Sequence, residues 1–269
     1  MEYLVDFGIR SQKYLPGFVT EKFTKNICSI MGKSTRKVDK LRYATTYKID
    51  WKKARKCKSS KDLDECLDKF ETVNDFFARK IDPSLTKPES TNKNDIVSPA
   101  ESYARTETAN SGFNIKGAKY SLKKLLDRED VPNKSKIYVF RLAPEQYHRF
   151  HSPTASKVVS IKEVGGTYKS VNPILLDSES VLQENYRKII EFENGIFMVT
   201  VGATCVGSVK LSIKKGSSVK HGDDIGYFEF GGSCIVLVIP KVLEKHNKSI
   251  TKNEGLIGTG KWVCQFKHT

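Results

Sequence analysis

The sequence predicts an α+β protein, with a body that is mainly a β barrel or sandwich and an N-terminal helical region before it. Within residues 1–82, apolar side chains recur at helical spacing. A polar stretch with two prolines follows at residues 83–95 and predicts a linker or exposed loop. From residue 96 to residue 269, short β-branched and aromatic runs alternate with turn signals, which predicts a β-rich domain.

The helical region is predicted from the spacing of its apolar side chains. Positions three and four residues apart lie on one face of a helix, and this spacing connects Leu63, Leu67, Phe70 and Val73. The segment 74–80 continues this helix. Because the residue before a proline is disfavoured in the helical conformation, the helix is expected to end by Asp82-Pro83.

The β-rich domain is predicted from runs of strand-forming residues between turns. These runs are Ile137–Leu142, Val158–Val164, Lys188–Phe192, Ile196–Val201 and Ser208–Ile213. Asn194-Gly195 lies between two of them and predicts a tight hairpin. Two further strands are expected to meet at Gly231-Gly232.

Composition excludes several classes of protein. The chain has 269 residues, 38% of them hydrophobic and 29% charged, which excludes a disordered chain and a multi-span membrane protein. The aliphatic run Ile235–Ile239 is too short to cross a bilayer. Glu2 and Asp6 interrupt the first residues, so we expect no secretory signal there. The net charge of +15 favours an anionic partner without choosing among nucleic acid, acidic lipid and acidic substrate.

The cysteines carry no metal-binding pattern. The six are Cys28, Cys57, Cys66, Cys205, Cys234 and Cys264. No two of them have the CxxC spacing typical of structural zinc, so we expect no metal site. Scattered cysteines in a chain of this length are typical of an intracellular protein, so we expect reduced thiols.

Two histidines lie close together in the segment RLAPEQYHRFHSP, residues 141–153. A spacing of three could place His148 and His151 on one side of a turn, where one ring donates a proton and the other accepts one. The alternative is a surface loop with two ordinary histidines.

A second set of candidates surrounds Gly232 and Ser233. The Ser233 hydroxyl could attack the adjacent Gly232 carbonyl if a base removed its proton. The alternative is a glycine bend between two strands. Glu101, in the segment SPAES, could orient an imidazole, or it could simply be solvated.

Taken in order, these segments resemble the phosphatidylserine decarboxylase family, in particular its larger fungal and plant-type branch. The segments that carry the resemblance are FETVNDFFARKIDPSL (70–85), IVSPAESYA (96–104), NIKGAKYSLKKLL (114–126), FRLAPEQYHRFHSP (140–153), GTYKSVNPI (166–174), VGATCVGSV (201–209) and GDDIGYFEFGGSC (222–234). Residues 1–65 contribute little to it.

The resemblance implies a proenzyme that cuts itself between Gly232 and Ser233. The products would be a β chain of residues 1–232 and an α chain of residues 233–269, with Ser233 converted to a covalent pyruvoyl group. That cofactor would form a Schiff base with phosphatidylserine and release carbon dioxide, which leaves phosphatidylethanolamine.

The resemblance also implies roles for individual residues. His151 matches the histidine that activates the serine together with a carboxylate, and His148 matches the histidine of proton transfer during decarboxylation. Glu101 stands where the family has aspartate, and Cys234 stands where it usually has threonine or serine. These two departures leave open a processing-defective homologue that binds acidic phospholipid without turnover.

The implied partners are phosphatidylserine, an anionic membrane surface and the two chains of one proenzyme, with a homo-oligomer left open. The enzyme would be intracellular and peripheral on a membrane, in an organelle that the sequence does not indicate. A basic nucleic-acid-binding module is the competing class. The sequence has no RNP1 segment, zinc pattern or basic helix-turn-helix, so we expect no nucleic-acid partner.

Overall fold

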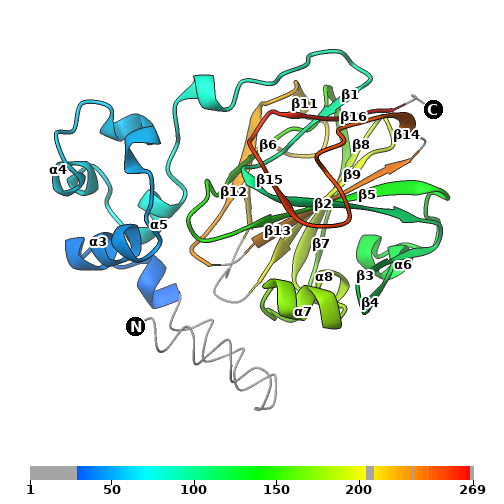
Figure 1. The fold of residues 1–269 in the computed structure, drawn as a ribbon, viewed down its shortest axis with the longest axis horizontal. Helices are drawn as coiled ribbons and strands as arrows, with labels where there is room; N and C mark the ends of the chain where they lie inside the picture. Colours follow the sequence, from blue (N-terminus) through cyan, green and yellow to red (C-terminus); the bar gives the residue numbers. More distant parts are fainter. Residues whose placement is uncertain (1–28, 204–208, 232, 241, 267–269) are drawn as a thin grey trace.

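A helical unit and a larger β body lie side by side in the computed structural model (Figure 1). The structure describes residues 29–203, 209–231, 233–240 and 242–266. The expectation of no secretory signal therefore concerns residues outside the described part. None of the helices in that part combines the length and apolar character needed to cross a membrane.

The helical unit, residues 29–85, consists of short helices joined by turns. Its elements are α3 (Lys37–Thr46), η1 (Trp51–Lys53), η2 (Arg55–Cys57), α4 (Leu63–Asp68), α5 (Val73–Phe77) and η3 (Pro83–Leu85). The single helix predicted from residue 63 to about residue 80 is wrong. It is divided because the Thr72 side chain accepts a hydrogen bond from Asp75 N at 3.0 Å and thereby starts a second helix.

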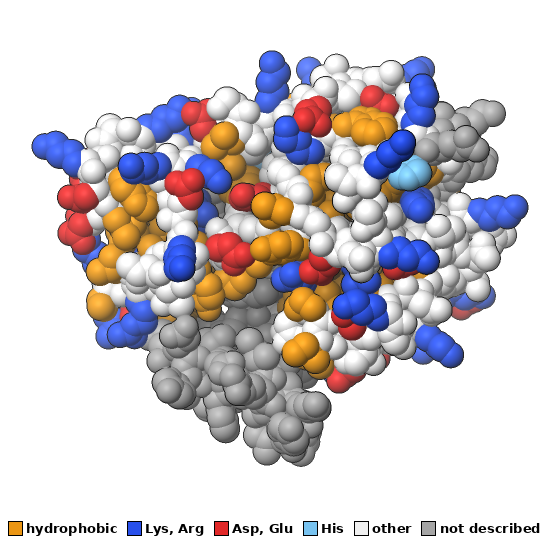
Figure 2. Space-filling model, viewed as in Figure 1, with side chains coloured by type: hydrophobic (Ala, Val, Ile, Leu, Met, Phe, Trp, Pro, Cys, Tyr) orange, Lys and Arg blue, Asp and Glu red, His pale blue; other side chains and the backbone are white. Residues whose placement is uncertain are grey.

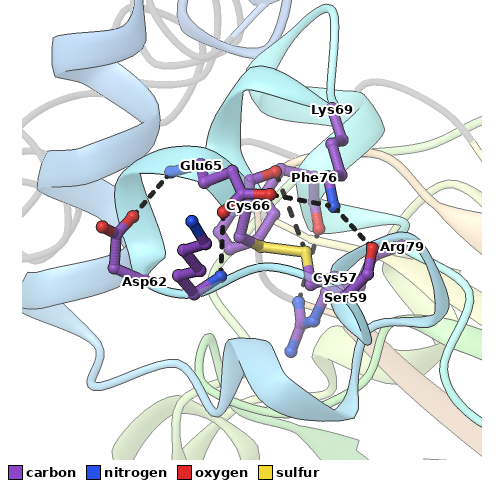
Figure 3. The surroundings of a disulfide bond; sticks show 9 residues. Cys57, Ser59, Asp62, Glu65, Cys66, Lys69, Phe76 and Arg79 are labelled. Carbon is purple, nitrogen blue, oxygen red and sulfur yellow. Dashed lines mark hydrogen bonds and ion pairs between the residues drawn. A yellow bond between two sulfur atoms is a disulfide. The ribbon is translucent and has the colours of Figure 1, made fainter.

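A disulfide between Cys57 and Cys66 joins η2 to α4 within the helical unit (Figure 3). The expectation that the cysteines are reduced thiols is therefore wrong for this pair. Spacing gave no sign of the bond, because the two cysteines meet only after the chain turns back between two short helices. Cys234 and Cys264 are free and buried, whereas Cys28 and Cys205 lie outside the described residues.

The β body is built on an eight-stranded antiparallel sheet with the order β11-β7-β8-β9-β13-β5-β2-β15. Its strands are β11 (Ser218–Val219), β7 (Ser156–Val164), β8 (Arg187–Phe192), β9 (Phe197–Gly202), β13 (Ser233–Pro240), β5 (Ser135–Leu142), β2 (Ser102–Ala109) and β15 (Gly255–Ile257). β13 lies inside this sheet, paired on one side with β5 and on the other with β9.

Smaller sheets and helices surround the large sheet. The small sheets are β1 (Asp95–Val97) with β16 (Trp262–Phe266) and β14 (Val242–His246), β10 (Val209–Leu211) with β12 (Asp224–Phe228) and β6 (Arg149–His151), and β3 (Gly112–Ile115) with β4 (Ala118–Ser121). The helices of the body are α6 (Leu122–Leu126), α7 (Pro173–Ser178) and α8 (Val181–Glu184).

The β-rich α+β class is confirmed. Four of the predicted runs coincide with β5, β7, β8 and β9, and β10 covers residues 209–211 of the fifth. The predicted hairpin joins β8 to β9, with Gly195 at φ 82° in the left-handed region that glycine tolerates. The large sheet is open, with β11 and β15 at its edges, so we find no closed barrel among the described strands.

The two faces of β13 pack against different clusters. Ile235, Leu237 and Ile239 join the cluster that includes Phe76 and Phe77 of the helical unit. Cys234, Val236 and Val238 join a second cluster on the opposite face. Because side chains alternate along a strand, Ser233 projects to the face that the helical unit covers.

Candidate active site

The segment around residues 231–233 crosses from one sheet to another. β12 ends at Phe228 in the three-stranded sheet with β6, and β13 begins at Ser233 in the large sheet. Gly231 has φ 144°, a conformation that side-chain-bearing residues rarely adopt. Gly232, the predicted partner of Ser233 in cleavage, lies outside the described residues. Gly231, the described half of the Gly231-Gly232 pair, therefore lies between a strand of one sheet and a strand of another.

Ser233 is fully buried, and its hydroxyl has no hydrogen-bond partner among the described residues. Its backbone is fixed on both sides, because the residue pairs with Leu142 of β5 and with Gly202 of β9. An unpartnered buried hydroxyl costs about 1–3 kcal/mol. Such a group is unusual unless a reacting group engages it.

His148 is another buried residue with a polar atom that lacks a partner in the described part of the chain. Its Nδ1 lies 2.9 Å from the Gln146 carbonyl oxygen, so Nδ1 carries the proton and Nε2 is an acceptor. Nε2 has no partner among the described residues. The Phe77 ring covers the imidazole at 4.0 Å between centroids. Burial lowers the pKa of His148 to about 3, so the ring is neutral at physiological pH.

His151 lies on β6 and has partners at both ring nitrogens. Its Nδ1 donates to the Gly222 carbonyl oxygen at 2.7 Å, and its Nε2 lies 3.1 Å from the Tyr147 hydroxyl. Burial lowers the pKa of His151, while the hydrogen bond to Gly222 opposes that shift. Since His148 and His151 are both buried, the alternative of a surface loop with two ordinary histidines is wrong.

Glu101 reaches this region through Tyr147. Its Oε2 accepts a hydrogen bond from Tyr147 N at 3.1 Å, and Lys53 Nζ lies 3.8 Å from Oε1. The Glu101 side chain is 29% exposed and forms no hydrogen bond with either candidate histidine within the described part of the chain. Tyr147 therefore joins the two predicted residues, because its backbone binds Glu101 and its hydroxyl binds His151.

The structure adds three residues that the sequence did not single out: Tyr147, Phe77 and Asn74. Phe77 contacts both His148 and Phe230, the latter at 5.4 Å between ring centroids. Asn74 Oδ1 accepts a hydrogen bond from Phe230 N at 2.7 Å. The available signal was the position of Asn74 and Phe77 inside the family-like segment 70–85.

Cys234 does not compete with Ser233 as a nucleophile in this arrangement. It projects to the opposite face of β13, into the cluster with Val236 and Val238. Burial raises its pKa far above the usual value for a thiol. The thiolate, which is the reactive form, is therefore scarce at neutral pH.

Among the described residues, a buried serine hydroxyl thus lies at the start of β13, after Gly231, and two buried histidines lie on and beside β6. Comparison with known proteins identifies the family. The family model described as phosphatidylserine decarboxylase matches residues 73–261. The chain therefore belongs to the phosphatidylserine decarboxylase family.

Individual relatives agree with this assignment. The chain is 39% identical over 207 residues to phosphatidylserine decarboxylase proenzyme 2 of Saccharomyces cerevisiae, covering 72% of this chain and 18% of that protein. It is 36% identical over 201 residues to the Clostridium perfringens proenzyme, covering 71% of this chain and 68% of that one. It is 34% identical over 189 residues to proenzyme 2 of Oryza sativa, covering 65% and 30%. The chain spans about a fifth of the length of its two fungal relatives from Saccharomyces cerevisiae and Komagataella phaffii.

Proposed function

We propose that this chain is a phosphatidylserine decarboxylase proenzyme that cuts itself between Gly232 and Ser233. The observation that carries the proposal is the buried Ser233 hydroxyl, which has no partner among the described residues and lies two positions after Gly231. The pyruvoyl group formed at position 233 supplies the carbonyl electron sink that amino-acid side chains lack. The product of the reaction is phosphatidylethanolamine.

Self-cleavage needs only atoms of the chain, one base and water. Ser233 Oγ loses its proton and attacks the Gly232 carbonyl carbon, so the amide becomes an ester and the Ser233 amine is released. Loss of the Ser233 α-proton then breaks the Cβ–Oγ bond and frees residues 1–232 with a carboxylate end. The remaining dehydroalanine tautomerises and is hydrolysed by water, which releases ammonia and leaves the pyruvoyl group.

We assign the role of base in self-cleavage to His151. The bond from its Nδ1 to Gly222 fixes the tautomer in which Nε2 accepts a proton. Tyr147 holds that Nε2 and is itself held by Glu101. Glu101 thus supports the His151 imidazole indirectly, through Tyr147. Because Glu101 does not have to reach the imidazole itself, its extra methylene relative to aspartate does not disturb this support.

We assign proton transfer during decarboxylation to His148. Its unprotonated Nε2 is buried and has no partner in the described part of the chain, and the Phe77 ring covers the imidazole, so water is excluded from it. A neutral imidazole in that state can accept one proton and return it within the same site. The neutral form is stable at physiological pH because burial opposes the charged form.

A membrane surface is the partner that the lipid substrate requires. The helical unit exposes Ile30 and Val38, which are 71% and 51% exposed, close in sequence to Lys33 and Arg36. Basic side chains near an anionic leaflet contribute about 1 kcal/mol each. Lys and Arg are spread over both regions in Figure 2, so we place docking on the helical unit because apolar and basic side chains occur there together.

The proposed enzyme is intracellular and peripheral on a membrane, and its two chains remain associated. The α chain contains β13, which lies between two strands of the β chain. The disulfide between Cys57 and Cys66 favours an oxidising compartment within the cell. Flotation with liposomes tests the surface: binding should rise with phosphatidylserine content and fall with salt.

A processing-defective relative is the second candidate. It is motivated by Glu101, which stands where the family has aspartate. A denaturing gel separates the two candidates. If the wild-type chain is active, it gives two bands where Ser233→Ala gives one. If it is defective, the wild-type chain and Ser233→Ala both give one full-length band. Restoration of cleavage by Glu101→Asp would locate the defect.

A further inference from the structure

We propose that Asn74 is a positioning residue for self-cleavage, because its side-chain oxygen fixes the backbone just before the bond that breaks. The proposal rests on the self-cleavage proposed above. Asn74 lies on α5, and its Oδ1 accepts a hydrogen bond from Phe230 N at 2.7 Å across 156 positions of sequence. The helical unit therefore holds the segment that leads into Ser233.

Phe230 is the last residue before the cleavage point that has a side chain to anchor, since two glycines follow it. Its ring makes edge contacts with Tyr43 and Phe77, at centroid distances of 5.5 and 5.4 Å. Its backbone amide is bound by Asn74. Both the ring and the amide of Phe230 are thus held by the helical unit.

The segment between Phe230 and Ser233 needs an anchor at each end. Glycine loses more conformational freedom on ordering than any other residue, and Gly231 takes the unusual φ of 144°. Ser233 is fixed by the large sheet, and Phe230 by Asn74. Attack requires the hydroxyl and carbonyl to meet in a narrow range of geometry, and a misplacement of about 1 Å can cost about a hundredfold in rate.

Gly32 leaves the space that the Asn74 side chain occupies. A Cβ at position 32 would lie 2.7 Å from Nδ2 and 2.8 Å from Oδ1 of Asn74, which is too close without a shift. The adjacent backbone is tied as well, because Val73 N donates to the Ser34 carbonyl oxygen at 3.0 Å. The Asn74 amide is therefore confined between Gly32 and Phe230.

Four substitutions test this arrangement through the rate of self-cleavage of the full chain. Asn74→Leu keeps the size but removes the acceptor, and Gly32→Ala displaces an intact Asn74. Each should slow cleavage about 10- to 100-fold. Asn74→Asp retains the Oδ1 acceptor and should stay within about twofold of wild type. Gly165→Ala is the matched glycine control, since a Cβ added at that position would have no atom within 4 Å. This variant should also cleave at the wild-type rate.

A second measurement does not depend on cleavage. In the uncuttable Ser233→Ala chain, amide hydrogen exchange at Phe230 should be protected. Adding Asn74→Leu should accelerate that exchange about tenfold or more, whereas adding Asn74→Asp should not. Wild-type rates in Asn74→Leu and Gly32→Ala, equal slowing in Asn74→Asp, or an unprotected Phe230 amide would each overturn the proposal. A wild-type chain that never cleaves counts against the proposed function, and the amide measurement still decides the role of Asn74.

Discussion

The β body and the helical unit contribute differently to the site. The β body holds the residues to which we assign chemistry: Ser233 at the start of β13, and His148 and His151 beside and on β6. The helical unit supplies the groups that cover and hold them, namely Phe77 on His148 and Asn74 on the Phe230 amide. The segment that leads into β13 thus belongs to one region, while side chains of the other region hold its Phe230.

The two regions are also stabilised differently. β13 exchanges hydrogen bonds with strands on both sides and lies in the centre of the large sheet. The helical unit has short helices, a disulfide and an aromatic contact surface. Substitutions at the assigned residues of the β body should therefore abolish self-cleavage or decarboxylation. Substitutions in the helical unit should lower the rates of these steps or the stability of the protein without abolishing either reaction.

The largest expected effect comes from the nucleophile. Ser233→Ala removes the attacking oxygen, so we expect no self-cleavage and a single band on a denaturing gel. Ser233→Thr retains a hydroxyl and should cleave slowly. Cleavage of Ser233→Ala at the wild-type rate would show that another group breaks the chain.

The two histidines should separate cleavage from decarboxylation. His151→Ala should slow self-cleavage about 10²- to 10⁴-fold, the usual contribution of a general base. His148→Ala should still cleave but lose decarboxylation by a similar factor. Time courses of chain cleavage and of carbon dioxide release measure the two steps, and an exchange of the two phenotypes would reverse the assignment.

The cover from the helical unit is tested by Phe77→Ala. Removing this buried ring should lower the free energy of unfolding by about 3–5 kcal/mol and raise the pKa of His148 as water reaches the imidazole. Phe113→Ala is the matched control, since Phe113 is buried in the cluster on the other face of the sheet. It should destabilise the protein without changing the His148 titration followed by NMR.

Loss of the disulfide should have a smaller effect, confined to the helical unit. Replacing Cys57 and Cys66 by serine should lower the free energy of unfolding by roughly 2–3 kcal/mol, given the short loop that the bond closes. Chemical denaturation measures the change. Dithiothreitol should destabilise the wild type by a similar amount and leave the double variant unchanged; equal effects on both would contradict the bond.

The effect that is smallest at neutral pH is the pH dependence of stability. His148 and His151 have pKa values lowered by burial, so the unfolded chain binds protons more readily than the folded one. The contribution of these histidines to the free energy of unfolding is fully present above the unfolded pKa of about 6.5. It is lost as the pH falls below that value, by up to about 1.4 kcal/mol per pH unit for each histidine. His148→Gln should reduce that slope. Self-cleavage should not slow between pH 8 and pH 6.5, because His151 stays neutral.

The parts of this site that follow from local pattern could be predicted from sequence. β13 is a continuous apolar run, and Gly231 marks the bend before it. The hairpin at Gly195 could be predicted in the same way, because the two residues Asn194 and Gly195 are enough to indicate the turn. These features depend on neighbours along the chain, which a sequence displays directly.

The remaining features depend on residues far apart in sequence. Asn74 meets Phe230, His151 meets Gly222, and Cys57 meets Cys66 only after the chain folds back. The spacing of cysteines does not determine their pairing. The break between α4 and α5 was missed because the capping by Thr72 outweighed the apolar spacing that predicted one helix.

The intact mass of the freshly purified wild-type chain, measured beside Ser233→Ala, decides whether the chain cuts itself. Two wild-type species are expected: residues 1–232, and a 233–269 fragment whose blocked N-terminus reacts with hydrazine. One uncut species is expected for the variant. A wild-type chain that stays at its full 30.4 kDa and never forms a keto group would contradict the proposed self-cleavage.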